Sequence, residues 1–178
     1  YEAALAIYRE IGPRTHEAGA LGNLGDLHHA VGRFKESSAC YEAALGVHRE
    51  RGDLRNEGAV LESLATLRAD EGRAADAHAT YLLALAASRE AGDRRREGYT
   101  LSSLGVLYLD EGDLARARKC FETALERHRE ADDRVLVAQD VGYLGRLALR
   151  DGRREEGLAL LEEACAGLEG RDERPFIT

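Results

Sequence analysis

The sequence predicts an all-α fold in which pairs of antiparallel helices stack into a right-handed superhelix. Two observations predict it: a pattern that returns every 40 residues without insertion or deletion, and apolar residues at three-and-four spacing within each copy. Leu24, Leu64, Leu104 and Leu144 mark the repeat, and each is followed eight residues later by a glycine. Self-similarity at a fixed period of this size is the sequence signature of a solenoid.

Residues 1–12 are expected to be the second helix of a repeat whose first helix is missing. Residues 1–11 match residues 41–51 almost position for position, and a Gly-Pro pair then marks a turn. Because the chain begins with Tyr1 rather than Met, in the middle of a repeat, we expect it to be a fragment of a longer protein.

Four complete repeats are predicted to follow, each with a first helix (helix A) and a second helix (helix B). In the first repeat Leu21, Leu24 and Leu27 form the apolar stripe of helix A, and Gly32 ends it by accepting the left-handed backbone conformation. The helices are expected at 15–31 and 34–50, 55–71 and 74–90, 95–111 and 114–130, and 135–151 and 154–169. The solenoid is predicted over 1–170, with repeats at 15–52, 55–92, 95–132 and 135–170 and a tail or linker at 171–178.

Charged residues recur at the repeat boundaries. Asp53, Asp93 and Asp133 precede successive A helices, where an aspartate can cap the helix or accept turn hydrogen bonds. An Arg-Glu pair recurs near the end of every helix B, beginning at Arg9, Arg49, Arg89 and Arg129. These arginines can form inter-repeat ion pairs and interact with the helix C-termini, or they can form a charged strip for a partner.

The charge balance and the cysteines exclude several classes of protein. The net charge is −8 over 178 residues, with acids and bases interspersed, so no nucleic-acid partner is expected. No apolar run of about 18 residues occurs, so no membrane insertion is expected. Three cysteines, Cys40, Cys120 and Cys165, lie on apolar helix faces, which favours reduced thiols and a cytoplasmic location.

No catalytic or metal-binding motif stands out. The chain has no Gly-x-Ser-x-Gly elbow, no phosphate-binding loop and no Cys-x-x-Cys pair. His28 and His29 diverge by about 100° on a helix, so they do not complete a metal site. We therefore expect no enzyme activity, no cofactor and no metal.

The repeat resembles the tetratricopeptide repeat, in the 40-residue form seen in polarity adaptors and many bacterial regulators. The third copy carries the family pattern most fully, with Leu101, Leu104, Gly105, Tyr108, Gly112, Ala117, Phe121 and Ala124. The resemblance implies a solenoid of one orphan helix and four helix pairs, in which small residues allow close helix approach and aromatic residues fill the remaining space. The Ala- and Arg-rich, Lys-poor composition suggests a bacterial source.

The resemblance also implies a peptide-binding groove on the concave face lined by the A helices. The groove residues expected by position are Asn23, Asp26, His29, Glu62, Ser63, Thr66, Tyr99, Ser102, Ser103, Asp110, Tyr143, Arg146 and Arg150. Their charge changes from acidic in the early repeats to basic in the last, which would suit a ligand that is basic at one end and acidic at the other. A second interpretation is that these side chains are only a solvated helix surface.

The leading functional hypothesis is a scaffold for protein–protein interaction that binds a peptide or helical segment of a partner. The alternative is a regulatory or sensor arm of a larger bacterial signalling protein (a STAND-type ATPase, a transcriptional regulator or a protease) that contacts its own effector domain. Terminal repeats normally need a polar cap, so end-to-end self-association through exposed terminal helices is also expected.

Overall fold

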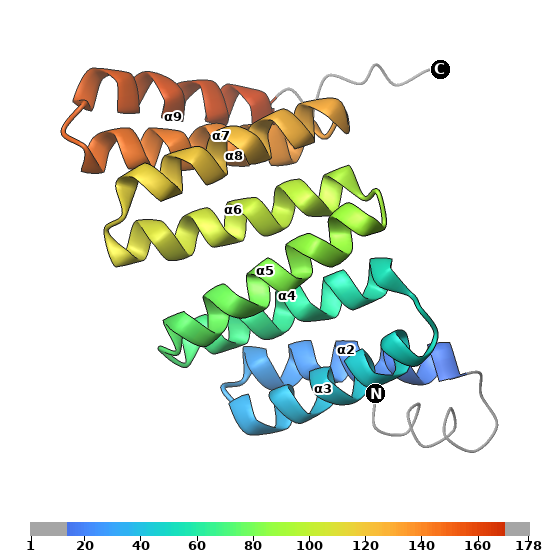
Figure 1. Cartoon of the computed structure of the whole chain (residues 1–178). Coiled ribbons are helices and arrows are strands. Elements are labelled where there is room, and N and C mark those ends of the chain that lie inside the picture. The colour runs from blue at the N-terminus through green and yellow to red at the C-terminus, as the bar shows by residue number, and fades with distance from the viewer. Residues whose placement is uncertain (1–13, 170–178) are drawn as a thin grey trace, which may run out of the picture. The chain divides into compact units, whose positions relative to one another are not determined.

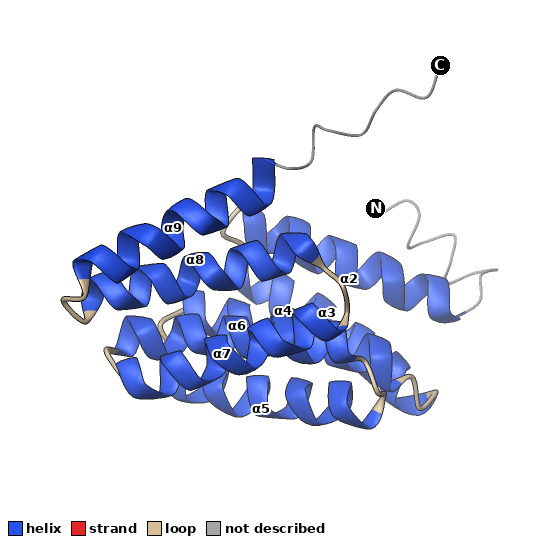
Figure 2. Cartoon of the chain, turned by 90° about the horizontal axis from the view of Figure 1, so that it is seen from above, coloured by secondary structure: helices blue, strands red, loops and turns tan. Residues whose placement is uncertain are grey.

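The computed structural model describes residues 14–169, which form eight helices and no strand (Figures 1 and 2). The helices are α2 (Arg14–Ala30), α3 (Phe34–Glu50), α4 (Leu54–Asp70), α5 (Ala74–Glu90), α6 (Arg94–Glu111), α7 (Leu114–Glu130), α8 (Arg134–Arg150) and α9 (Arg154–Glu169). The predicted all-α fold of helix pairs is confirmed over this part of the chain. The helix expected at 1–12 and the tail at 171–178 lie outside the described residues.

The chain divides into two compact units, and both are built in the same way. Unit 1 ends at Asp93 and contains α2 to α5, whereas unit 2 begins at Arg94 and contains α6 to α9. Within each unit every helix packs on the next one, and the two A helices (α2 with α4, α6 with α8) also touch each other. Among the described residues no such contact joins the two B helices of a unit. The described B helices of each unit therefore pack on A helices and not on each other.

The helix ends follow from local sequence. Gly52 has φ of 64° and donates its N–H to the Arg49 carbonyl, while the Asp53 N–H reaches the His48 carbonyl, so the last carbonyls of α3 are satisfied. The Asp53 carboxylate then accepts from the Asn56 N–H at 3.2 Å and caps the start of α4. Asp133 caps α8 in the same way as Asp53 caps α4.

One turn departs from this rule. Asp132 occupies the place of Gly52 and Gly92 and has φ of 51°, and it is the only non-glycine residue with positive φ among the described residues. Its N–H still reaches the Arg129 carbonyl at 3.1 Å, so the turn closes normally. Asp132 therefore adopts the left-handed backbone conformation that glycine adopts more easily than any other residue.

Small residues let helix B lie close against helix A. A Cβ placed on Gly25 would stand 2.5 Å from the ring of Tyr41, and one on Gly105 would stand 2.6 Å from the ring of Phe121. The aromatic rings of α3 and α7 thus fill the space that these two glycines leave. Both rings are buried, with Tyr41 1% and Phe121 0% exposed.

Each unit has its own apolar core. In unit 1 a buried cluster joins α2, α3, α4 and one residue of α5, with Phe34 and Cys40 packed against it. Its members are Ala20, Leu21, Leu24, Tyr41, Ala44, Leu45, Val60, Leu61, Leu64, Leu67 and Ala84. In unit 2 Leu125, Val141 and Ala164 form a cluster that joins α7, α8 and α9. Of the apolar stripe predicted for the first A helix, Leu21 and Leu24 belong to the cluster of unit 1, whereas Leu27 is 50% exposed.

Candidate functional site

The residues expected to line the groove divide between the two units. Unit 1 holds the set on α2 and α4: Asn23, Asp26, His29, Glu62, Ser63 and Thr66. Unit 2 holds the set on α6 and α8: Tyr99, Ser102, Ser103, Asp110, Tyr143, Arg146 and Arg150. We call these the A-helix residues of unit 1 and of unit 2. Several of them are bonded to other parts of their own unit.

In unit 1, tyrosines of the B helices reach two of the A-helix residues. The Tyr41 hydroxyl donates to Asp26 Oδ1 at 2.7 Å, and in the next repeat the Tyr81 hydroxyl lies 2.9 Å from Thr66 Oγ1. Burial of Tyr41 raises the pKa of this tyrosine well above its usual value, and so does the negatively charged Asp26 carboxylate that accepts its hydrogen bond. Asp26 and Thr66 thus fasten helix B to helix A.

His29 links the two A helices of unit 1. Its Nε2 lies 2.7 Å from Asp70 Oδ2, across 41 residues of sequence, and its ring packs edge-on against Phe34. Glu62 is only 8% exposed. The side chain of Asn23, by contrast, is exposed and forms no hydrogen bond with another described residue. Its amide is therefore open to a ligand.

In unit 2, an aromatic and cationic group stands on α8. Tyr143 stacks on Phe121, with ring centroids 5.0 Å apart and an interplanar angle of 18°, and its hydroxyl accepts from Gln139 Nε2 at 2.9 Å. The Arg146 guanidinium lies 5.8 Å from the Tyr143 ring centroid. On α6, Tyr99 is 41% exposed. A partly exposed aromatic face beside a cation is a common contact surface for a peptide.

Arg150 and Asp110 differ in their availability. The Arg150 guanidinium donates to the Leu109 carbonyl oxygen and so joins α8 to α6. The carboxylate of Asp110 is exposed and forms no hydrogen bond or ion pair with another described residue. Arg150 supports the packing of the two A helices, whereas Asp110 is free to meet solvent or a partner.

Three buried polar side chains form a cluster at the centre of unit 2 that the sequence analysis did not find. Ser102 Oγ donates to Asp140 Oδ1 at 2.5 Å, and His128 Nδ1 lies 2.6 Å from Asp140 Oδ2. His128 Nε2 lies 3.2 Å from the Arg95 carbonyl oxygen. Both ring nitrogens of His128 therefore lie within hydrogen-bond distance of an oxygen. The exposed fractions are 6% for Ser102, 0% for His128 and 1% for Asp140.

This cluster does not have the geometry of a hydrolase triad. In a triad the serine hydroxyl bonds to the imidazole, which removes its proton. Here the hydroxyl bonds to the carboxylate and to the Gly98 carbonyl oxygen. The three residues connect α6, α7 and α8. The available sequence signal was Asp140 itself, since Ala20, Val60 and Thr100 hold that place in the other repeats.

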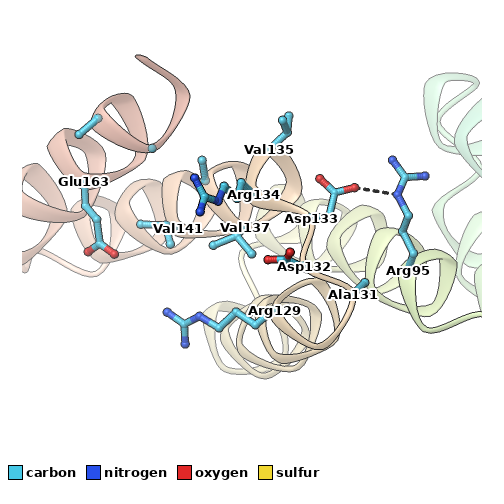
Figure 3. A pocket seen from close by; sticks show the side chains of 13 residues that line it. Arg95, Arg129, Ala131, Asp132, Asp133, Arg134, Val135, Val137, Val141 and Glu163 are labelled. Atoms are coloured by element: carbon cyan, nitrogen blue, oxygen red, sulfur yellow. Dashed lines mark hydrogen bonds and ion pairs between the residues drawn. The ribbon is translucent and has the colours of Figure 1, made fainter. Parts of the chain in front are cut away.

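An open pocket of about 970 Å³ lies in unit 2, between the C-terminal halves of α7 and α9 with α8 as its floor (Figure 3). We call it the α7–α9 pocket. Its lining residues are Arg95, Arg129, Ala131, Asp132, Asp133, Arg134, Val135, Val137, Ala138, Val141, Glu163, Ala166 and Gly167. None of the A-helix residues of unit 2 lines it, so it is a separate surface.

Metal sites, thiols and membrane spans are quickly described. The described residues contain no group of three or more His, Cys, Asp or Glu side chains that could hold a metal ion. None of the three cysteines forms a disulfide, and burial raises the pKa of the Cys120 thiol to about 11. Within residues 14–169, no helix combines the length and apolarity that crossing a bilayer requires.

Stacked helix pairs with glycine-to-aromatic contacts define a helical repeat protein. The comparison with known families gives the particular one. The tetratricopeptide repeat family matches residues 16–90 and 96–170, and the chain belongs to that family. Its 40-residue period is the longer form predicted from the sequence. No curated protein sequence matches the chain.

Solved structures of repeat proteins share the fold. BtubC from P. vanneervenii aligns with a TM-score of 0.80 at 22% identity, over 96% of this chain and 71% of that protein. A Rap protein complexed with competence and sporulation factor aligns with a TM-score of 0.81 at 15% identity, over 90% of this chain and 45% of that one. A STAND protein with a tetratricopeptide repeat sensor, from Pyrococcus horikoshii, aligns with a TM-score of 0.79 at 15% identity, over 92% of this chain and 25% of that one. The chain thus spans less than half the length of the last two.

Proposed function

We propose that this chain is a protein–protein interaction scaffold that binds a peptide or helical segment of a partner on its A helices. The observation that carries the proposal is the presence, in both units, of A-helix side chains with unused binding capacity. These are the Asn23 amide in unit 1 and the Tyr143–Arg146 pair in unit 2.

The chemistry of these groups suits an extended peptide. An asparagine amide donates and accepts, so Asn23 can pair with both the N–H and the C=O of a peptide backbone. Arg146 can bind a carboxylate bidentately while its stem lies against an aromatic ring. One structural relative, a Rap protein, is seen in complex with competence and sporulation factor. We propose a binding role of this kind, without catalysis and without a cofactor.

Within the predicted groove set we propose two roles. Asp26, His29, Thr66, Ser102 and Arg150 hold the helices in place through the bonds described above, and Glu62 is buried. The ligand contacts are assigned to the exposed or half-buried remainder: Asn23, Ser63, Tyr99, Ser103, Asp110, Tyr143 and Arg146.

The test is a pull-down with the wild-type chain and an Asn23→Ala/Arg146→Glu variant, after circular dichroism shows that both are equally helical. Arg150 is left intact because its guanidinium is bonded to the Leu109 carbonyl. Lys119→Glu is the matched charge reversal, since Lys119 is exposed on a B helix. A protein that wild type and Lys119→Glu retain, and that the A-helix variant loses, supports the proposal. Equal retention by all three would contradict it.

A second candidate is a regulatory or sensor arm that contacts the effector domain of its own, larger protein. The observation that favours it is the short span of this chain relative to the STAND protein and the Rap protein. For either role we propose a protein partner rather than nucleic acid or membrane, given the net charge of −8. A cytoplasmic location and end-to-end self-association belong to the same proposal. Light scattering over a concentration series tests the self-association.

A further inference from the structure

In both units a glutamate near the start of an A helix pairs with arginine side chains. In unit 1 the Nε of Arg49, on α3, lies 2.8 Å from Glu57 Oε1, on α4. In unit 2 Glu97 of α6 is almost fully buried, and its Oε2 takes Arg94 at 2.9 Å and Arg127 at 3.3 Å. A carboxylate at this place in helix A therefore gathers arginine side chains around it.

The last repeat has lost that carboxylate. Val137 stands 40 residues after Glu97 and 80 residues after Glu57. Arg129 corresponds to Arg49, and Arg134 corresponds to Arg94, so both arginines keep their places without the acid that their counterparts contact. Neither forms a hydrogen bond or ion pair through its side chain with another residue of the described range 14–169. Both line the α7–α9 pocket, and in Figure 3 they lie on either side of Val137.

The acids that line the pocket do not replace the missing glutamate. Asp133 is bonded to Arg95 at 2.7 Å. Asp132 and Glu163 line the pocket, yet neither forms an ion pair with a described residue. Two exposed guanidinium groups therefore stand over an apolar floor formed by Val137, Ala138 and Val141.

We propose that the α7–α9 pocket binds a partner segment that presents a glutamate side chain beside an aliphatic one. The partner carboxylate takes the place that Glu57 and Glu97 hold in the other repeats, between Arg129 and Arg134. The neighbouring aliphatic side chain packs on Val137 and Val141. Planar bidentate pairing of a carboxylate with a guanidinium supplies the specificity. A monovalent carboxylate fits better than a phosphate dianion, because Asp132 and Glu163 repel the second charge.

This inference is independent of the binding proposed for the A helices, because the two surfaces share no residue. It also assigns a purpose to the difference between the last repeat and the others. Of the arginines considered from the sequence as a charged strip, Arg129 lines this pocket. The corresponding arginine in unit 1, Arg49, is already held by Glu57.

The test uses the whole chain labelled with ¹⁵N and two acetylated, amidated tripeptides, Leu-Glu-Leu and Leu-Gln-Leu. We expect the Glu peptide to shift the backbone signals of Arg129, Arg134 and Val137 and the Nε–Hε signals of the two arginines. We expect the Gln peptide to bind about tenfold more weakly, the usual consequence of losing a charge-assisted hydrogen bond. Arg129→Gln and Arg134→Gln should each weaken binding of the Glu peptide, again by about tenfold.

The decisive variant is Val137→Glu, which restores the internal carboxylate of the other repeats. It should fold as well as wild type, by circular dichroism and thermal unfolding, and should no longer bind the Glu peptide. Val137→Gln is its uncharged control: it removes the same valine without adding a carboxylate, so it should weaken binding of the Glu peptide less than Val137→Glu does. The proposal is overturned if the Glu and Gln peptides bind equally or if Val137→Glu binds the Glu peptide as wild type does. It is also overturned if about 1 mM Glu peptide shifts none of these signals, which would mean a Kd well above about 1 mM. A phosphoserine peptide that binds more tightly than the Glu peptide would also overturn it.

Discussion

The ring of Tyr41 occupies the space that a Cβ on Gly25 would need. The ring cannot move aside freely, because its hydroxyl is bonded to Asp26. We therefore expect Gly25→Ala to destabilise the chain by about 1–3 kcal/mol, the usual consequence of overpacking a core. Urea unfolding followed by circular dichroism measures the change.

Gly46→Ala is the matched control for this substitution. Gly46 lies in helix α3 of the same unit, and a Cβ there would meet nothing within 4 Å. The higher helix propensity of alanine should stabilise the chain by about 0.5–1 kcal/mol. If the two alanine variants shift stability in the same direction, the close approach at Gly25 does not decide the packing of helix B.

Asp132 carries the positive φ that glycine carries at the equivalent turns. Asp132→Gly should therefore stabilise the chain by about 0.5–1 kcal/mol, because it removes the contact between Cβ and the carbonyl oxygen in the left-handed conformation. Asp132→Ala removes the same carboxylate but keeps the Cβ, so it separates the charge from the backbone effect. A glycine variant no more stable than the alanine variant, as measured by thermal unfolding, would contradict this account.

At the scale of the element, the aspartate caps make the helix starts sensitive to acid. Hydrogen bonds from the Asn56 side chain and backbone, aided by nearby His48, outweigh burial and lower the pKa of Asp53. Stability from such a group is complete above the unfolded pKa of about 4 and is lost as the pH falls through the folded pKa. Protonation removes the negative charge that strengthens the hydrogen bonds to this cap of α4.

Asp53→Ala should therefore cost about 1 kcal/mol at pH 7, and the difference from wild type should shrink below about pH 4. Asp53→Asn keeps a capping oxygen that does not titrate, so it should remain close to wild type at neutral pH and lose less stability in acid. Urea unfolding of wild type, Asp53→Ala and Asp53→Asn, at pH 7 and again below about pH 4, provides the comparison. A constant difference between Ala and wild type across this range would exclude the cap as the titrating group.

The helices were predictable because their signals are local and repeat four times. Apolar spacing and turn glycines placed them, and the error at the A helices is small: α4 begins at Leu54 rather than at residue 55 because Asp53 itself is the cap. The roles of the groove side chains were less predictable. Helical period shows that Asp26 and Ser102 point away from the apolar stripe, but not that Tyr41 reaches one and Asp140 the other from a different helix. Such contacts depend on the angle and distance between helices.

At the scale of the whole molecule, each unit depends on different interactions. Unit 2 has a buried polar contact at its centre, between His128 and Asp140, and the ring of His128 fills the space beside Gly98. Removing one partner of a buried pair leaves an uncompensated polar group. Asp140→Ala should therefore destabilise unit 2 by about 1–3 kcal/mol, the usual cost of leaving a buried polar group without its hydrogen-bond partner.

Hydrogen exchange would show where that loss falls. In a repeat protein each helix pair depends mainly on its neighbours, so protection should fall in α6, α7 and α8 and be retained in α2 and α3. Asp110→Ala removes an exposed carboxylate of the same unit and should change stability by less than about 0.5 kcal/mol. A uniform loss of protection through all described helices would show that the array unfolds as one body.

The hydroxyl contacts of Tyr41 and Tyr81 bear on how such a gene can change. The repeats that carry tyrosine in helix B carry Asp26 or Thr66 in helix A, whereas the repeat with Phe121 carries Val106. Whole 40-residue cassettes can be duplicated or exchanged by recombination without separating these pairs. A crossover in the turn between the two helices would set a tyrosine hydroxyl beside valine. The unit that recombination can duplicate or exchange in this chain should therefore be the helix pair and not the single helix.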